Sequence, residues 1–90
     1  MTGFHRRDGV LHADGVALTA IAEQIGTPVY VYSRAHFEAR YDALVAALRP
    51  LDADICFAVK SNSNLGVLRC FAALGAGFDI VSGGELQRVI

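Results

Sequence analysis

One lysine in this sequence stands where an amine could do chemistry. Lys60 follows the apolar run 55–59 and precedes the polar, turn-forming cluster 61–64. A lysine withdrawn from water has a lowered pKa, so its neutral amine can attack a carbonyl group and form a Schiff base. Lysines at strand ends more often simply extend into water. Lys60 is therefore a candidate nucleophile, although its spacing alone does not decide between these two roles.

Asp79 is the charged residue inside a second apolar run, Phe78 to Val81. A buried carboxylate is costly unless a cation or several hydrogen-bond donors meet it. Lys60, on the neighbouring predicted strand, is one partner for it. A position facing a loop, or backbone N–H groups as donors, would explain the residue equally well. Asp79 is thus a second candidate catalytic residue, with both interpretations open.

The remaining polar patterns point to structure. Ser82 and Glu85 have the S-x-x-E spacing of a capping box and predict the start of a helix from Glu85 onward. The glycines around them complete neither a phosphate-binding nor a dinucleotide-binding loop. The histidines share no metal-ligand spacing and no C-x-x-C pair occurs, so we expect no metal site, and we expect Cys56 and Cys70 to be buried.

The elements that must position Lys60 and Asp79 follow from hydrophobic periodicity. Two Asp-Gly pairs around 10–13 predict short strands joined by tight turns, and Thr19 is the expected cap of a short helix. The sequence then predicts a strand at 29–32 and a helix from Ser33 to Pro50, whose apolar stripe is Phe37, Tyr41, Leu44, Val45 and Leu48. It next predicts a strand at 54–59, a helix that faces inward through Leu65, Leu68 and Ala72, and a strand at 78–81.

Alternation along the strand 54–59 predicts which side chains share a face. Ile55, Phe57 and Val59 fall on one face, and Cys56, Ala58 and Lys60 on the other. Short connections favour parallel strands with right-handed crossovers, which leaves a (β/α)8 barrel or an open doubly wound sheet. In a barrel, Lys60 would end its strand at the C-terminal mouth, where barrel enzymes keep their chemistry.

Composition narrows the class of protein. The 90 residues are 53% hydrophobic and 19% charged with a net charge of −1, which excludes a disordered tail and leaves no basic field for nucleic acid. Apolar runs reach only about five residues, too short to cross a membrane, and Arg6 and Arg7 are not followed by an export signal. We expect a cytoplasmic chain. Two strands make an incomplete sheet, so we also expect a fragment.

Three stretches, "GTPVYVYS", "ICFAVKSNSNLGVLR" and "LGAGFDIVSGGEL", resemble the opening of the diaminopimelate decarboxylases in content, order and spacing. These are pyridoxal phosphate enzymes of the alanine-racemase-like barrel class. The resemblance implies an α/β fold, the start of a (β/α)8 barrel that binds pyridoxal 5'-phosphate. Residues 33–90 would form its first helix-strand-helix-strand-helix part, and residues 1–32 would belong with a C-terminal β-domain.

By this resemblance Lys60 matches the lysine that holds the cofactor, Asp79 a family acid close to it, and Glu85 an acid that recurs in the wider class. The implied reaction converts meso-diaminopimelate to L-lysine and CO2, in a homodimer with shared active sites and with the phosphate-binding and substrate-binding residues beyond residue 90. The piece alone would be inactive. Alternatives are a decarboxylase for ornithine, arginine or carboxynorspermidine, or a non-catalytic barrel that binds pyridoxal phosphate.

Overall fold

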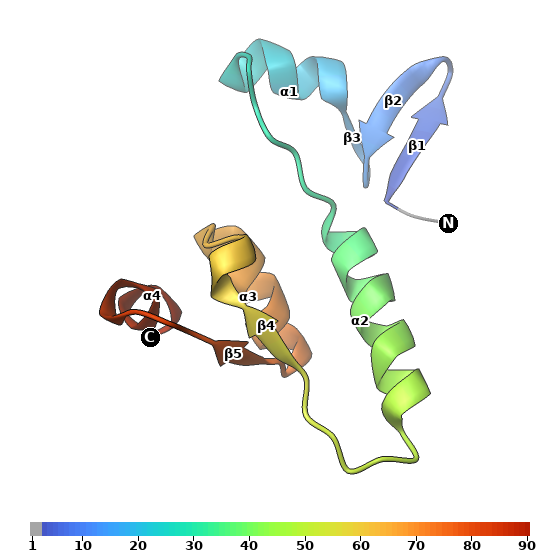
Figure 1. Ribbon diagram of the computed structural model, residues 1–90. Coiled ribbons are helices and arrows are strands. Elements are labelled where there is room, and N and C mark those ends of the chain that lie inside the picture. Colours follow the sequence, from blue (N-terminus) through green and yellow to red (C-terminus); the bar gives the residue numbers. More distant parts are fainter. Residues whose placement is uncertain (1–2) are drawn as a thin grey trace.

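A small antiparallel sheet forms the first part of the chain in the computed structural model, which describes residues 3–90 (Figure 1). Its strands, in the order β1-β2-β3, are β1 (Phe4–Arg7), β2 (Val10–Ala13) and β3 (Val16–Ala17). The first Asp-Gly pair turns the chain with positive φ at both residues, 53° at Asp8 and 81° at Gly9. Asp and Gly tolerate this region better than other residues, so the predicted tight turn is confirmed here.

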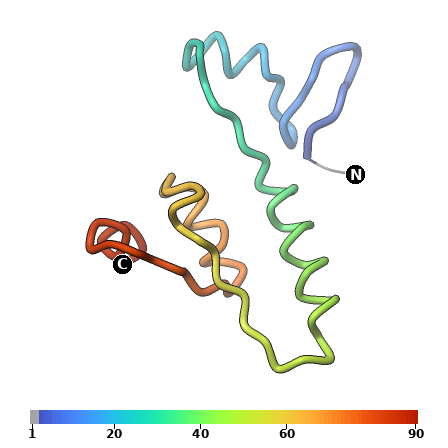
Figure 2. The backbone as a smooth tube through the Cα atoms, viewed as in Figure 1, coloured from blue at the N-terminus to red at the C-terminus, as the bar shows by residue number. Residues whose placement is uncertain are grey.

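The next stretch departs from the prediction at two places. Helix α1 (Leu18–Ile25) follows Ala17 directly, so Thr19 lies inside the helix, and its predicted role as the cap is wrong. The predicted strand at 29–32 is also wrong, because that stretch carries no regular structure and runs as a link between α1 and α2 (Figure 2). Its β-branched and aromatic residues favour an extended backbone, but a strand also needs a neighbour to pair with.

Ser33 joins the N-terminal sheet to the long helix α2 (Arg34–Leu48). Its hydroxyl accepts a hydrogen bond from the backbone N–H of His36 at 3.0 Å, which confirms it as the N-cap. The same hydroxyl donates to the Asp14 carboxylate at 2.6 Å. Ser33 is 3% exposed, and a Cβ on Gly3 would collide with its side chain. The turn after β2 and the start of α2 are therefore held together by side chains in close contact.

The rest of the chain has the predicted order of helix, strand, helix, strand, helix. After α2 come β4 (Cys56–Ala58), the 3-10 turn η1 (Val59–Ser61), α3 (Leu65–Leu74), β5 (Gly77–Asp79) and α4 (Gly83–Val89). β4 and β5 pair in parallel, with Phe57 opposite Phe78 and Ala58 opposite Asp79. Both strands are shorter than predicted. Gly75 ends α3 in the left-handed conformation expected of a C-cap glycine.

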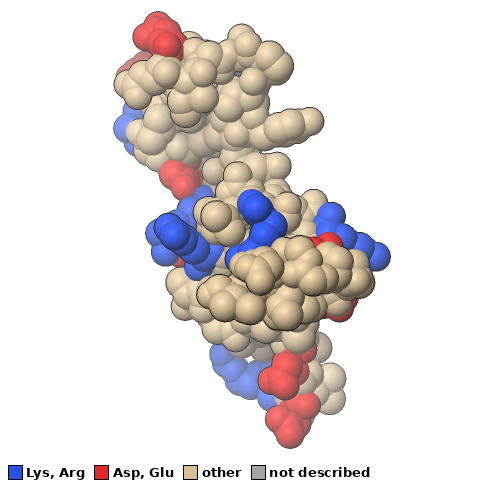
Figure 3. Space-filling view, turned by 90° about the vertical axis from the view of Figure 1, so that its left-hand side faces the viewer, with Lys and Arg blue, Asp and Glu red and all other residues tan. Residues whose placement is uncertain are grey.

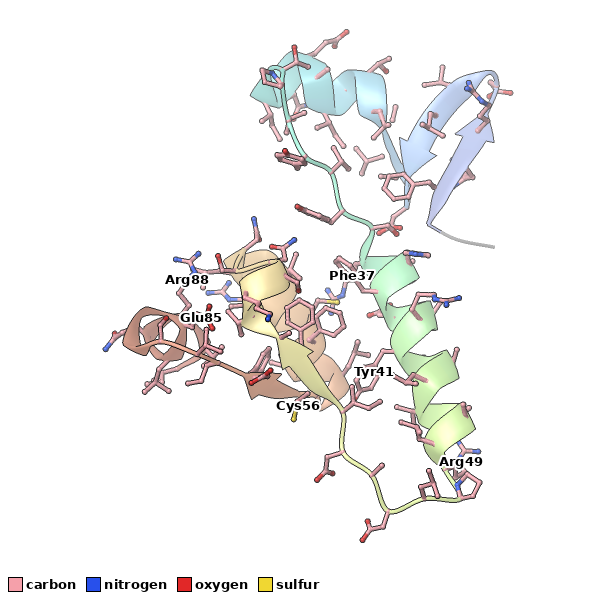
Figure 4. The ribbon with its side chains drawn as sticks, viewed as in Figure 1. Phe37, Tyr41, Arg49, Cys56, Glu85 and Arg88 are labelled. Carbon is pink, nitrogen blue, oxygen red and sulfur yellow. The ribbon has the colours of Figure 1, made fainter. Side chains whose placement is uncertain are left out.

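An aromatic cluster around Phe71 packs α2, α3 and β4 together. The Phe71 ring in α3 is stacked on Phe57 of β4, with ring centroids 4.4 Å apart. Phe37 and Tyr41 of α2 reach the same ring, at 5.3 and 6.5 Å (Figure 4). These rings bury apolar area from three elements at one place. The predicted stripe on α2 is thus confirmed where it meets Phe71, whereas Leu44 and Val45 stay exposed.

The cap at Ser33 yields a stability prediction. Ser33→Ala removes the acceptor for the His36 N–H and the donor to Asp14, so we expect the free energy of unfolding to fall by about 1–2 kcal/mol. Urea denaturation measures this change. Ser63→Ala, at an exposed position, is the matched control and is expected to leave stability within about 0.5 kcal/mol of the parent protein. Equal effects of the two substitutions would contradict the role of Ser33.

The aromatic cluster yields a second prediction. Phe71→Leu removes the ring that three elements share, and we expect unfolding to become easier by about 1–3 kcal/mol. Tyr41→Phe keeps a ring at the edge of the same cluster and should change stability little. Thermal unfolding of the two variants compares them directly. A Phe71→Leu protein as stable as Tyr41→Phe would show that the cluster does not hold these elements together.

Candidate active site

Lys60 does not end a strand, which corrects the prediction. β4 ends at Ala58, and Lys60 is the middle residue of η1, with an exposed side chain. The chain turns early because Val59 points into the core and is fully buried, at 0% exposure. Two hydrogen bonds close the turn: the Ser61 hydroxyl donates to the Ala58 carbonyl at 2.7 Å, and the Asn62 N–H donates to the Val59 carbonyl at 3.1 Å. Lys60 therefore sits on a tight turn just past the carboxyl end of β4.

Asp79 is the last residue of β5 and is exposed, so of the two interpretations left open, the one that needs a buried carboxylate does not hold in this chain. It is the register partner of Ala58, two residues before Lys60. In a parallel pair, residues at the carboxyl ends of neighbouring strands share one edge of the sheet. Lys60 and Asp79 accordingly lie at the same edge. Within residues 3–90, no ion pair joins them.

One face of the two-stranded sheet is lined by small residues. Cys56 and Ala58 point to this face from β4, and their register partners Gly77 and Asp79 do so from β5. The opposite face carries Phe57, which packs on α3. This confirms the predicted separation of a bulky, helix-facing side from a small side in β4. The small face is open enough that Cys56 is exposed, which corrects its expected burial.

Cys70 is buried in α3, as predicted. Burial raises the pKa of its thiol; the positive charge of Arg34 lowers the pKa and the negative charge of Glu38 raises it further, both more weakly. The thiol therefore stays protonated at neutral pH, which favours packing over chemistry. Within residues 3–90, no group of three or more His, Cys, Asp or Glu side chains is placed to hold a metal ion.

The loop between η1 and α3 is shaped by Asn64, whose role the sequence analysis missed. Its side-chain oxygen accepts hydrogen bonds from the N–H groups of Gly66 at 2.8 Å and Val67 at 3.4 Å, so Asn64 is the N-cap of α3. The signal was present in the sequence, since asparagine directly before an apolar-periodic run is a common helix start. The cap fixes where the turn carrying Lys60 joins the helix.

The capping box at α4 is confirmed in part. The Ser82 hydroxyl accepts from the Glu85 N–H at 3.1 Å, but the Glu85 carboxylate accepts from the N–H of Val81 at 2.9 Å, one residue before the expected partner. The helix therefore begins at Gly83, two residues earlier than predicted. Glu85 is held by the backbone that follows β5, and both Glu85 and Arg88 belong to α4 (Figure 4).

Charge is unevenly spread over the face on which α3 and α4 lie. Basic side chains gather across the middle of this face in Figure 3, and acidic side chains lie mostly above and below them. The whole chain has a net charge of −1, so this local excess of cations arises from placement and not from composition. A surface of this kind attracts anionic ligands.

Residues 34–90 match the family described as pyridoxal-dependent decarboxylase, pyridoxal binding domain. The chain belongs to this family, and the predicted cofactor, pyridoxal phosphate, is confirmed by that match. Among its relatives is a diaminopimelate decarboxylase of Pseudomonas fluorescens, 63% identical over 90 residues and covering 100% of this chain and 22% of the relative. A diaminopimelate decarboxylase of Vibrio cholerae is 52% identical over 86 residues, 96% of this chain and 21% of the relative.

Solved structures share the fold of this chain. The crystal structure of diaminopimelate decarboxylase from M. jannaschii in co-complex with L-lysine has a TM-score of 0.87 and 34% identity over 99% of this chain and 23% of that chain. AQ1208 from Aquifex aeolicus has a TM-score of 0.86 and 45% identity over 97% of this chain and 21% of that chain. The predicted fold class, the α/β start of a barrel that binds pyridoxal phosphate, is confirmed. The chain spans about a fifth of the length of these proteins.

The described residues suit pyridoxal phosphate. The cofactor needs a lysine amine for its aldehyde and space for a flat ring, and Lys60 stands exposed at the edge of a sheet face that carries only small side chains and one carboxylate. Gly77 is part of that face, and a Cβ there would lie 2.9 Å from the Cys56 sulfur. Because position 77 has no side chain, the space beside the Cys56 thiol on this face stays free.

Gly77 generates a testable prediction. In Gly77→Ala the new methyl group must displace the Cys56 thiol, so we expect a loss of about 1 kcal/mol in unfolding free energy. Cys56→Ala in the same protein removes the obstacle and should recover most of that loss, which a double-mutant cycle measured by urea denaturation would detect. Gly83→Ala, with nothing within 4 Å of its Cβ, is the control. Additive effects at positions 56 and 77 would refute the contact.

Proposed function

We propose that this chain is the first part of a pyridoxal phosphate-dependent enzyme that decarboxylates meso-diaminopimelate to L-lysine and CO2. The observation that carries the proposal is the placement of Lys60 at the carboxyl edge of a parallel strand pair, in a chain 63% identical along its whole length to a diaminopimelate decarboxylase. The solved relative in complex with L-lysine supports the choice of product. The proposal concerns the whole protein, of which this chain holds one side of the site.

Lys60 is the residue proposed to hold the cofactor. The Lys60 Nζ would hold pyridoxal phosphate through the aldehyde of the cofactor. The bound cofactor supplies the electron sink for the loss of carboxylate. Lys60 is on a tight turn with its side chain exposed, so the amine is accessible to a cofactor and a substrate.

Asp79 is proposed as the acid beside the cofactor lysine. It lies at the same sheet edge, and its carboxylate has no ion-pair partner within residues 3–90. The negative charge of Asp79 at this edge would attract the positively charged substrate amine. The proposed role of Asp79 is therefore to draw the substrate amine toward Lys60.

The arrangement of the whole protein is also part of the proposal. We propose that residues 33–90 begin the barrel and that residues 1–32 associate with a C-terminal β-domain. We also propose that the protein is a cytoplasmic homodimer whose subunits share active sites. The small sheet face with Cys56 and Asp79 then forms part of the barrel interior, which explains why it carries no bulky side chain. Within residues 3–90, no helix is long and apolar enough to cross a membrane.

Borohydride trapping tests the assignment of Lys60. Reduction of the full-length protein with bound pyridoxal phosphate converts the lysine–cofactor linkage to a stable secondary amine. Lys60 is the only lysine among these 90 residues, and its modification blocks tryptic cleavage there, so the label is expected in the peptide 41–69, since Pro50 protects the bond after Arg49. A label found only outside this peptide would end the assignment.

Activity measurements complete the test. Lys60→Arg keeps the charge but cannot condense with the cofactor, so we expect loss of both the trapped label and CO2 release. Asp79→Asn should retain the label while kcat falls about 10²-fold. The substrates to compare are meso-diaminopimelate, ornithine, arginine and carboxynorspermidine. Consumption of ornithine, arginine or carboxynorspermidine in place of meso-diaminopimelate would overturn the substrate assignment, and a labelled protein that releases CO2 from none of them would overturn the enzyme assignment.

A further inference from the structure

Arg88 of α4 reaches across to the loop that carries Lys60. Its Nε donates a hydrogen bond to the backbone carbonyl of Ser63 at 2.8 Å, between residues 25 positions apart. The other side-chain hydrogen bonds of this loop are local: Ser61 bonds the Ala58 carbonyl, and the Asn62 side chain accepts from the Asn64 N–H at 3.0 Å. Arg88 therefore ties the loop to a distant element, as Figure 4 shows by its position between α4 and α3.

Arg88 also lines a cleft on the surface. It forms part of the wall of a cleft of about 210 Å³ between α3 and α4, together with Leu65, Leu68 and Phe78. Arginine side chains pack their methylene groups on apolar surface while the guanidinium reaches a polar partner. Arg88 thus contacts the Lys60 loop from a position in the wall of this cleft.

The same helix also holds the segment that follows Asp79. Glu85, three residues before Arg88, accepts a hydrogen bond from the Val81 N–H at 2.9 Å. Val81 is two residues beyond Asp79, and Ser63 is three residues beyond Lys60. One helix therefore binds the backbone just downstream of both candidate catalytic residues, through side chains one turn apart.

We propose that Arg88 is a positioning residue that fixes the Lys60 turn relative to Asp79. This inference rests on the proposed function, since it concerns where the Lys60 amine stands. Lys60 is exposed and lies on a three-residue turn, so the backbone of its loop decides where the amine points. Misplacement of a reacting group by about 1 Å can cost as much as 10²-fold in rate. The hydrogen bond from Arg88 to the Ser63 carbonyl, three residues beyond Lys60, is suited to prevent such a misplacement.

The experiment compares Arg88→Met with Arg49→Met in the full-length protein. Both replace an exposed arginine by an unbranched apolar side chain, but Arg49 lies at the far end of α2 (Figure 4). The first readout is the rate at which added pyridoxal phosphate, trapped with borohydride, labels the peptide 41–69. The second is hydrogen–deuterium exchange of the amides at 59–64, and the third is Tm.

For Arg88→Met we expect labelling at Lys60 to slow by about tenfold and the amides at 59–64 to exchange faster, with kcat reduced in parallel. Arg49→Met should match the parent protein in all three. Arg88→Lys keeps the charge and most of the stem, and should recover part of the labelling rate. A structural role alone would instead lower Tm without changing the labelling rate of the folded protein.

The outcomes separate this inference from the proposed function. If the parent protein is not labelled at Lys60, the proposed function fails and the inference fails with it. If the parent is labelled at Lys60 and Arg88→Met is labelled at the same rate, the positioning role alone is overturned. Should Arg88→Met fail to fold, Arg88→Lys decides: a labelling rate equal to that of the parent, with unchanged exchange at 59–64, overturns the inference.

Discussion

The stacking of Phe71 on Phe57 is the contact on which the arrangement of this chain depends. A parallel pair of three-residue strands has too few hydrogen bonds to be stable by itself. The Phe71 ring fastens β4 to α3, and Phe37 and Tyr41 bring α2 to the same place. With the bulky face of the strand committed to the helices, the other face is left to small residues. The space beside Lys60 is a consequence of that division.

Three side chains hold the backbone on either side of Lys60. Val59 anchors one end of the Lys60 turn in the core, Asn64 fixes the other end at the start of α3, and Arg88 binds the loop between them. Asp79 is placed by its strand register and by the anchoring of Val81 to Glu85. The side chains proposed to act, Lys60 and Asp79, are exposed, whereas the backbone beside each of them is held by hydrogen bonds from α4. This is the usual way to keep a reactive group free but well placed.

The sequence predicted the order of the C-terminal elements, because each carries a signal within its own residues: the stripe on α2, the apolar strands, Gly75 and the pair Ser82 and Glu85. It failed where the outcome depends on residues far along the chain. The stretch 29–32 has strand-like residues but no partner strand among the described residues, and the strand 54–59 is shortened because Val59 turns into the core. The tether from Arg88 to Ser63 joins two exposed residues with no shared pattern, so no local signal announced it.

The bond between Asp14 and Ser33 has a consequence for how this region can evolve. It joins residues 19 positions apart and orients the start of α2 on the N-terminal sheet. The stretch 27–31 between α1 and that bond therefore does not have to transmit the orientation. Insertions, deletions and substitutions in the stretch 27–31 should be tolerated among homologues more readily than changes at Gly3, Asp14 or Ser33. Differences in length are therefore expected in that stretch, while the bond between Asp14 and Ser33 is kept.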